Sequence, residues 1–150
     1  MDLPDEEKVI LGMSKEYIQQ HALLSKHLDN VRHIKANSFS YDFTEPGQKF
    51  DLVFIDGDHH YKGVLNDTRK VFSHLVHENS IVVWHDYAYH PEEVRYEVMA
   101  AILDGMDPSL HGQVYHVAST MCAIYLPVSL PANKLAEGTF KVNITFVPGS

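Results

Sequence analysis

Several residue types that define common protein classes are scarce in this sequence. A single cysteine, Cys122, excludes an internal disulfide and a cysteine-rich zinc site. With 12 Lys and Arg against 20 Asp and Glu, the formal charge is −8, so the chain lacks the cationic face that sequence-independent binding of a phosphate backbone needs. No apolar run approaches the roughly 18 residues of a membrane span. The N-terminus MDLPDEEK is acidic from residue 2, which is unlike a signal peptide. We therefore expect a cytoplasmic protein that binds neither nucleic acid nor membranes.

The residues that are present favour one α/β domain over residues 1–150. The chain has 150 residues, of which 45% are hydrophobic and 21% charged, and this balance is that of a globular domain. Two nearly continuous apolar runs, FDLVFI at 50–55 and SIVVW at 80–84, are typical of parallel strands that are buried on both faces. The order strand, helix, strand, helix, then two close strands is an α/β pattern. The expected helices begin at Tyr61 and span 91–103, and the later strands span 113–117 and 121–126.

The two ends of the chain are less regular. Residues 5–28 have apolar positions at helical spacing, broken near Gly12, and residues 30–36 are expected to form a short strand followed by a loop to residue 49. The tail at 127–150 contains three prolines and the alternating segment Phe140–Phe146, which predicts an amphipathic edge strand.

Ionisable residues follow both buried strands directly. Asp56, Asp58, His59 and His60 come after the first strand, and the His85–Asp86 pair comes after the second. In an open parallel sheet, ligands bind beyond the carboxyl ends of the strands, so the two groups are expected to meet at one rim. Carboxylates held close together repel one another, and a divalent cation or a cationic ligand would relieve this repulsion. For a single aspartate, capping of the next helix is the simpler role, and for the two groups together we favour a site.

Two motif interpretations compete for this rim. Asp58-His59-His60 matches the three-letter signature of the DHH phosphoesterases, which bind metals for phosphodiester hydrolysis, but no convincing upstream aspartate motif precedes it. The longer stretch FDLVFIDGDHHYKGVLNDTRKVFSHLVHENSIVVWHDY, residues 50–87, resembles the latter half of class I S-adenosylmethionine-dependent methyltransferases, in the branch with an IDGDHxY segment and a strand ending in HDY. This resemblance extends over roughly residues 30–126 and implies a mostly parallel, Rossmann-like sheet with flanking helices and an antiparallel strand near the C-terminus.

The resemblance also implies roles for individual residues. The cofactor would be S-adenosylmethionine and the substrate a small molecule. The implied base is His59, and His85 is the second catalytic candidate. By position in the family, Asp56, His85 and Asp86 would hold a divalent metal that orients the acceptor, although histidine is a softer ligand than Mg²⁺ prefers. The residues implied to bind the cofactor are Asp2, Asn37, Ser38 and Asp56.

One family feature has no counterpart in the sequence. The glycine-rich loop after the first strand should precede the acidic residue that ends the second strand, and here Asp2 already fits that acidic position. We therefore expect an N-terminally incomplete domain, either a fragment or a member that has lost the front of the cofactor site. The apolar edge of residues 50–55 would then need a cover, from strand pairing across the gap or from a second copy of the chain, with Phe140–Phe146 as a candidate donor. Three functions remain open: a methyltransferase whose missing part is supplied by its gene or by another chain, a metal-dependent phosphoesterase, and a non-catalytic binding or assembly protein.

Overall fold

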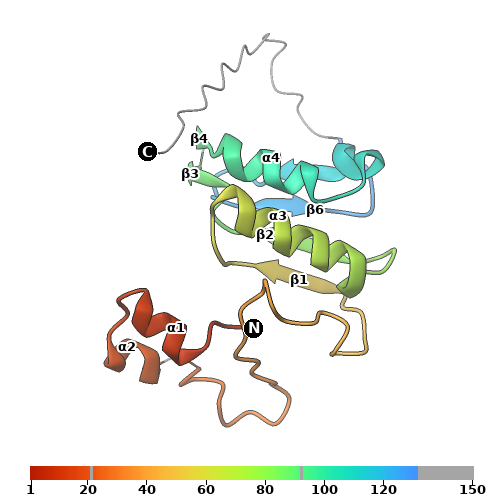
Figure 1. The fold of residues 1–150 in the computed structure, drawn as a ribbon. Helices are drawn as coiled ribbons and strands as arrows, with labels where there is room; N and C mark the ends of the chain where they lie inside the picture. The colour runs from red at the N-terminus through yellow and green to blue at the C-terminus, as the bar shows by residue number, and fades with distance from the viewer. Residues whose placement is uncertain (21, 92, 132–150) are drawn as a thin grey trace.

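In the computed structural model, described for residues 1–20, 22–91 and 93–131, a four-stranded sheet carries two helices on one face (Figure 1). The strand order is β1-β2-β6-β5, and the strands are β1 Leu52–Ile55, β2 Ile81–Trp84, β5 Val114–His116 and β6 Ala123–Tyr125. The helices α3 (Tyr61–Lys70) and α4 (Tyr96–Asp104) pack against each other and against the sheet. This confirms an α/β domain.

Only one of the three pairings in the described sheet is parallel. β1 pairs with β2 in parallel, whereas β6 is antiparallel to both β2 and β5. The predicted mostly parallel sheet is therefore not confirmed, although the predicted antiparallel strand near the C-terminus is present. Parallel pairing needs a long crossover connection, and β1–α3–β2 is the one crossover of this kind in the described sheet. The chain between β5 and β6 is short and returns antiparallel.

The core lies between the sheet and the two helices. Trp84 at the end of β2 is 1% exposed, and its indole Nε1 donates a hydrogen bond of 3.0 Å to Oγ1 of Thr68 on α3. The ring of Phe72 stacks on Trp84 with its centroid at 6.1 Å and meets Tyr125 edge-on at 5.2 Å. Phe72 lies in a π-helical turn, Val71–Leu75, that continues α3. These contacts fix β2 relative to α3 just before the ionisable residues at the end of the strand.

The opposite face of β1 is open, which corrects the expectation that residues 50–55 are buried on both faces. Leu52 is 61% exposed and Phe54 is 56% exposed, while the alternate residues Val53 and Ile55 pack on the core. β1 is also an edge strand of the described sheet, because β2 is its one partner there. The apolar run correctly predicted a strand, but burial of its second face requires a layer that the described residues do not provide.

Three other sequence expectations are corrected or untestable in the structure. Residues 30–36 form no strand. Their β-type pairing consists of one isolated parallel bridge between Lys35 and Asp2. The helix expected at 91–103 begins only at Tyr96, because residues before it form a hairpin of β3 (Ala88–His90) and β4 (Glu93–Val94). The predicted edge strand Phe140–Phe146 lies outside the described residues.

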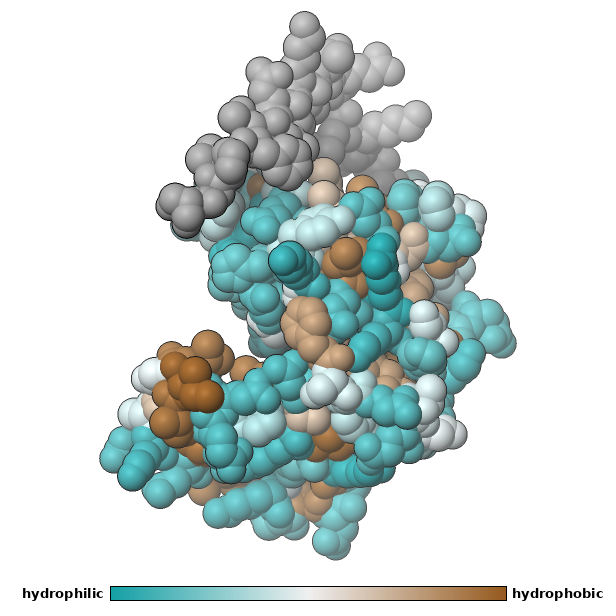
Figure 2. Space-filling view, viewed as in Figure 1, coloured by the Kyte–Doolittle hydropathy of each residue, from teal (hydrophilic) through white to brown (hydrophobic). Residues whose placement is uncertain are grey.

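The N-terminal segment forms two short helices that lie apart from the sheet (Figure 1). α1 (Asp5–Ile10) and α2 (Lys15–Gln20) flank Gly12, whose φ of +81° confirms the predicted break. Apolar side chains remain at the surface of this segment, where Figure 2 shows a brown patch, and Ile10 and Leu24 are more than four-fifths exposed. No helix in the described ranges has the length and apolar character needed to cross a membrane.

Candidate functional site

The rim at the carboxyl ends of β1 and β2 brings together three ionisable side chains: Asp56, His85 and Asp86, hereafter the rim cluster. One ligand atom from each lies within 4.8 Å of the other two. Parallel pairing puts Ile55 opposite Trp84, so the residues that follow the two strands emerge side by side. The expected meeting of the two strand ends is therefore present in the structure.

His85 lies between the two carboxylates. Its Nδ1 atom is 3.3 Å from Oδ1 of Asp56 and 3.3 Å from Oδ1 of Asp86. Both distances are within ion-pair range, yet this buried Nδ1 makes no aligned hydrogen bond. The His85 Nδ1 atom and the two carboxylate oxygens thus lie close together without forming aligned hydrogen bonds. The side chain of His85 is 32% exposed and that of Asp86 is 29% exposed, so part of each side chain is open to solvent although Nδ1 itself is buried.

The backbone of Asp86 is strained. Its φ is +55°, in the left-handed region where residues other than glycine are uncommon and aspartate is among the more tolerant. Such conformations cluster at functional sites because the surrounding structure must hold them in place. Asp86 lies in a turn that follows β2 directly, and its carboxylate lies beside the His85 ring. This observation favours a site over simple helix capping, since Asp86 precedes a hairpin and not a helix.

Asp58, His59 and His60, which follow Asp56 after β1, are not part of the rim cluster. Oδ1 of Asp58 accepts hydrogen bonds from the His60 backbone amide at 3.0 Å and from the His60 ring at 2.5 Å. The ring of His59 stacks on that of His60 with centroids 4.8 Å apart, and both residues are exposed. Within the described ranges Asp58, His59 and His60 join no group of three metal-ligating side chains.

This pairing shifts two pKa values. Partial burial acts to raise the pKa of Asp58, but the hydrogen bonds and the charge of His60 outweigh it and lower that pKa. The hydrogen bond to Asp58 and its negative charge raise the pKa of His60. Asp58 thus forms a turn before α3 instead of capping it, and the first amide of α3, on Tyr61, donates to Oε1 of Glu97 at 3.0 Å.

The residues expected on the cofactor side are engaged in contacts of their own. Asp2 forms an ion pair with the buried Lys8, and the Asn37 side-chain amide donates to Glu7 at 2.6 Å. Oγ of Ser38 accepts from Nδ2 of Asn66 on α3 at 3.5 Å. Asp56 belongs to the rim cluster instead, and its side chain is 55% exposed. The structure therefore divides the predicted site into a rim cluster and a loop at Asn37–Ser38.

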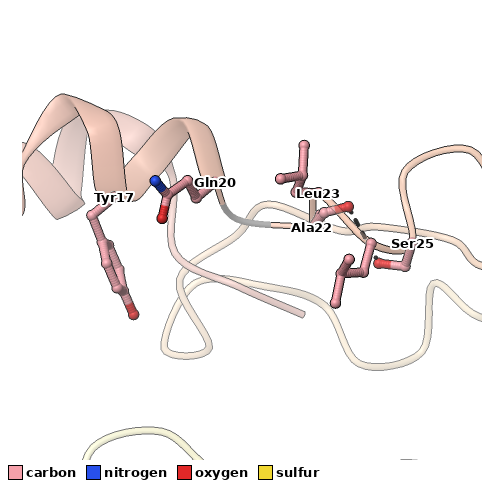
Figure 3. A pocket seen from close by; sticks show the side chains of 6 residues that line it. Tyr17, Gln20, Ala22, Leu23 and Ser25 are labelled. Atoms are coloured by element: carbon pink, nitrogen blue, oxygen red, sulfur yellow. Dashed lines mark hydrogen bonds between the residues drawn. The ribbon is translucent and has the colours of Figure 1, made fainter.

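Two cavities lie in the N-terminal segment and neither borders the rim cluster. The larger, about 300 Å³, has the lining Tyr17, Gln20, Ala22, Leu23, Leu24 and Ser25, and Figure 3 shows that most of these side chains are apolar. The smaller, about 110 Å³, includes Asp2 in its lining. Its volume is below the roughly 300 Å³ at which small-molecule sites begin.

Lys70 and Thr68 contribute to the site region, and the sequence did not single them out. Nζ of Lys70 donates to the carbonyl oxygens of Ser38, Phe39 and Tyr41. Thr68 receives the Trp84 hydrogen bond described above. No local sequence pattern predicts either role, because the hydrogen-bond partners of Lys70 and Thr68 are between 16 and 32 residues away in the sequence.

The fold and the rim cluster define the class of this protein: an α/β domain with a polar cluster at the carboxyl ends of two adjacent parallel strands. The family comparison is specific: a family model described as "Methyltransferase domain" matches residues 4–87, which is more than half of the chain. The chain therefore belongs to this methyltransferase domain family. Comparisons with curated proteins and with solved structures found no match.

Proposed function

We propose that the protein transfers a methyl group from S-adenosylmethionine to a hydroxyl group of a small molecule, with the rim cluster organising the acceptor. Family membership supports methyl transfer as the reaction class. The single observation that carries the rest is the convergence of Asp56, His85 and Asp86 on one point at the rim. In α/β folds this rim is where ligands bind.

The rim cluster fits a divalent cation. Two carboxylates and an imidazole are a common donor set, and the buried Nδ1 of His85 lacks an aligned partner while lying 3.3 Å from both carboxylate oxygens. The mixed oxygen and nitrogen set suits Mn²⁺ or a similar transition metal better than Mg²⁺. A bound cation would act as a Lewis acid toward the acceptor oxygen. The three side chains would hold it there and fix the direction from which the acceptor approaches.

The fit to S-adenosylmethionine is uneven along the chain. The carboxylates of Asp56 and Asp86 suit the positively charged methionine half of the cofactor. The printed sequence has 8 glycines and no GxGxxG cluster, and the cavity at Asp2 is small. The family resemblance implies that Asn37 and Ser38 bind the cofactor, and we infer that they contact its adenosine half. Asp2 forms an ion pair with Lys8, and we infer that it acts on the cofactor site through this pair.

The chain's own residues then have two tasks in the reaction. The cofactor supplies an electrophilic methyl group on a sulfonium sulfur. As the acceptor oxygen forms its bond to the methyl carbon and the sulfur–carbon bond breaks, the hydroxyl proton passes to a base. His59 is the proposed base because it is exposed and lies three residues after Asp56 in the segment between β1 and α3. Positioning by the rim cluster supplies most of the acceleration, since a well-oriented acceptor avoids an entropic cost of several kcal/mol, roughly 7–11 in favourable cases.

The metal proposal has a matched control within the chain. Asp86→Asn removes one carboxylate from the rim cluster, and Asp51→Asn removes a carboxylate from another Asp–His pair, in which His77 Nε2 lies 3.0 Å from Asp51. Mn²⁺ binding to the full chain is measured by electron paramagnetic resonance. We expect Asp86→Asn to weaken Mn²⁺ by about tenfold or more, since loss even of outer-shell partners costs this much, and Asp51→Asn to leave it unchanged. Equal effects of both variants, or no Mn²⁺ binding by the wild type, contradict the proposal.

The phosphoesterase alternative receives no specific support. It needs Asp58, His59 and His60 as metal ligands, and Asp58 and His60 are paired with each other away from the rim cluster. A non-catalytic assembly role would need neither cation nor cofactor binding at the rim cluster. Titration of S-adenosylhomocysteine by calorimetry separates these cases: saturable binding supports the methyltransferase, and no heat at millimolar ligand refutes it.

We also propose that the edge of β1 that the described strands leave unpaired pairs with a second copy of the chain. A two-fold axis through Val53 would place Leu52 opposite the second copy's Phe54, so that the same apolar patch, 61% and 56% exposed, is used by both copies. Light scattering after size-exclusion chromatography should give a dimer that Phe54→Lys dissociates. The control is Leu24→Lys, which changes an exposed apolar side chain of the N-terminal segment, away from β1. A wild-type monomer at high concentration, or dissociation by Leu24→Lys alone, contradicts this pairing.

A further inference from the structure

The last residue of α3 holds a distant loop through its side chain. The ammonium group of Lys70 lies 2.5 Å from the carbonyl oxygen of Ser38, 3.0 Å from that of Phe39 and 3.1 Å from that of Tyr41. A lysine ammonium has three N–H donors, so these three carbonyls use all of them. The ammonium also lies 5.2 Å from the ring centroid of Phe43, which is buried in the core. The ammonium group of this half-buried lysine is therefore committed to the loop.

The loop has a geometry that calls for a cation. The carbonyl of Asn37 accepts hydrogen bonds from the amides of Ser40 at 3.1 Å and Tyr41 at 2.9 Å, which makes residues 37–41 a single helix-like turn. The carbonyls at the end of such a turn are unsatisfied and carry partial negative charge. A positive charge placed at that end satisfies them and orders the turn, and charge-assisted hydrogen bonds are stronger than neutral ones.

The same helix contacts the turn that follows β1. A Cβ placed on Gly57 would lie 3.4 Å from Oδ2 of Asp67, and one placed on Gly63 would lie 2.6 Å from Oδ2 of Asp58. Gly57 and Asp58 thus approach α3 closely at Asp67 and Gly63, while Asn66 and Lys70 of the same helix contact the Asn37–Ser38 loop. α3 therefore sets the separation between this loop and Asp56, the two places on which the proposed cofactor site depends.

We propose that Lys70 is a positioning residue for the cofactor: it holds the loop 37–41 against α3 and so presents Asn37 and Ser38 to the adenosine half of S-adenosylmethionine without touching the cofactor. This inference rests on the proposed function, because it assigns those two residues to cofactor binding. Pre-organisation of a binding loop raises affinity by removing the cost of ordering it in the complex. Loss of Lys70 should therefore weaken cofactor binding and leave metal binding at the rim cluster unchanged.

The experiment uses the full chain and three variants. Lys70→Met keeps the length of the side chain and removes its donors, Lys70→Arg keeps a charge and donors, and Lys62→Met removes the same charge from an exposed position of the same helix. Calorimetry measures S-adenosylhomocysteine affinity, and hydrogen exchange measures protection of the Ser40 and Tyr41 amides. We expect Lys70→Met to weaken binding about tenfold and to speed exchange at both amides, with partial rescue by Lys70→Arg and no change for Lys62→Met. Mn²⁺ affinity should be the same in all four proteins.

The outcomes separate this inference from the function on which it rests. If the wild type binds S-adenosylhomocysteine and Lys70→Met binds equally well, the positioning role is wrong and the proposed function stands. If Lys70→Met weakens Mn²⁺ and S-adenosylhomocysteine to the same degree, the effect is general destabilisation and the inference is overturned. If the wild type binds no S-adenosylhomocysteine, the proposed function fails and the cofactor role of Lys70 fails with it. In that case, faster exchange at Ser40 and Tyr41 in Lys70→Met would show that Lys70 does order the loop and that only the proposed function is wrong. Unchanged exchange would refute the loop contact as well.

Discussion

The hydrogen bond between Trp84 and Thr68 should be a large local contributor to stability. Thr68 is 0% exposed and Trp84 1% exposed, and the bond joins the last residue of β2 to α3 directly before His85. Thr68→Val replaces the hydroxyl with a methyl group of similar size, so the packing changes little. The buried indole N–H then loses its hydrogen-bond acceptor. Leaving one buried donor unsatisfied costs about 1–3 kcal/mol, and we expect a loss in this range.

The assay is urea unfolding followed by Trp84 fluorescence, the indole being the single tryptophan of the chain. Circular dichroism provides a second probe and also serves for variants that lack the indole. A double-mutant cycle with Trp84→Phe isolates the pair, because Thr68→Val should cost little once the indole donor is absent. A coupling energy below about 0.5 kcal/mol would refute the reasoning, since neighbours that share a buried hydrogen bond couple by more than this. The same variant should weaken Mn²⁺ binding, because His85 follows Trp84 directly.

Two further predictions concern the surroundings of the rim. Asp58→Asn should lower the pKa of His60, measured by proton NMR titration. The Asp58–His60 pair should stabilise the fold mainly between about pH 4 and 6.5, since its contribution is lost below the lowered pKa of Asp58 and above the raised pKa of His60; a wild-type-to-variant difference in Tm that is constant from pH 3 to 9 would contradict this. Gly105→Ala should destabilise the protein by about 1–3 kcal/mol in urea, because its Cβ would lie 2.7 Å from Cβ of Thr68, whereas Gly112→Ala, with nothing within 4 Å, should change stability by less than about 0.5 kcal/mol.

Patterns over short stretches predicted the part of the fold that positions the rim. The apolar runs at 50–55 and 80–84 predicted β1 and β2, and the helical period after Tyr61 predicted α3. The meeting of Asp56 with His85 and Asp86 followed from one rule, that parallel strands end at the same rim. These features depend on local periodicity and on a single crossover, which the sequence encodes directly.

Features that depend on tertiary context were missed. The helix expected at 91–103 begins later, because the chain pairs as the β3–β4 hairpin and Arg95 donates its amide to the Tyr87 carbonyl before α4 begins. The exposure of Phe54 depends on which layers cover the sheet, and an apolar run does not specify this. The contacts of Lys70 are with backbone carbonyls about 30 residues away. Every residue has a backbone carbonyl, so the sequence does not indicate which of them a lysine will contact.

The central claim is that S-adenosylmethionine binds at the rim shared by β1 and β2. Amide NMR spectra of the full chain, recorded during titration with S-adenosylmethionine, test it most directly. We predict saturable shifts at residues 37–38, 56–59 and 85–86, with the α1–α2 segment unaffected apart from Glu7, which contacts Asn37. Shifts confined to the cavity between Tyr17 and Ser25, or no shifts at millimolar ligand, would contradict the account.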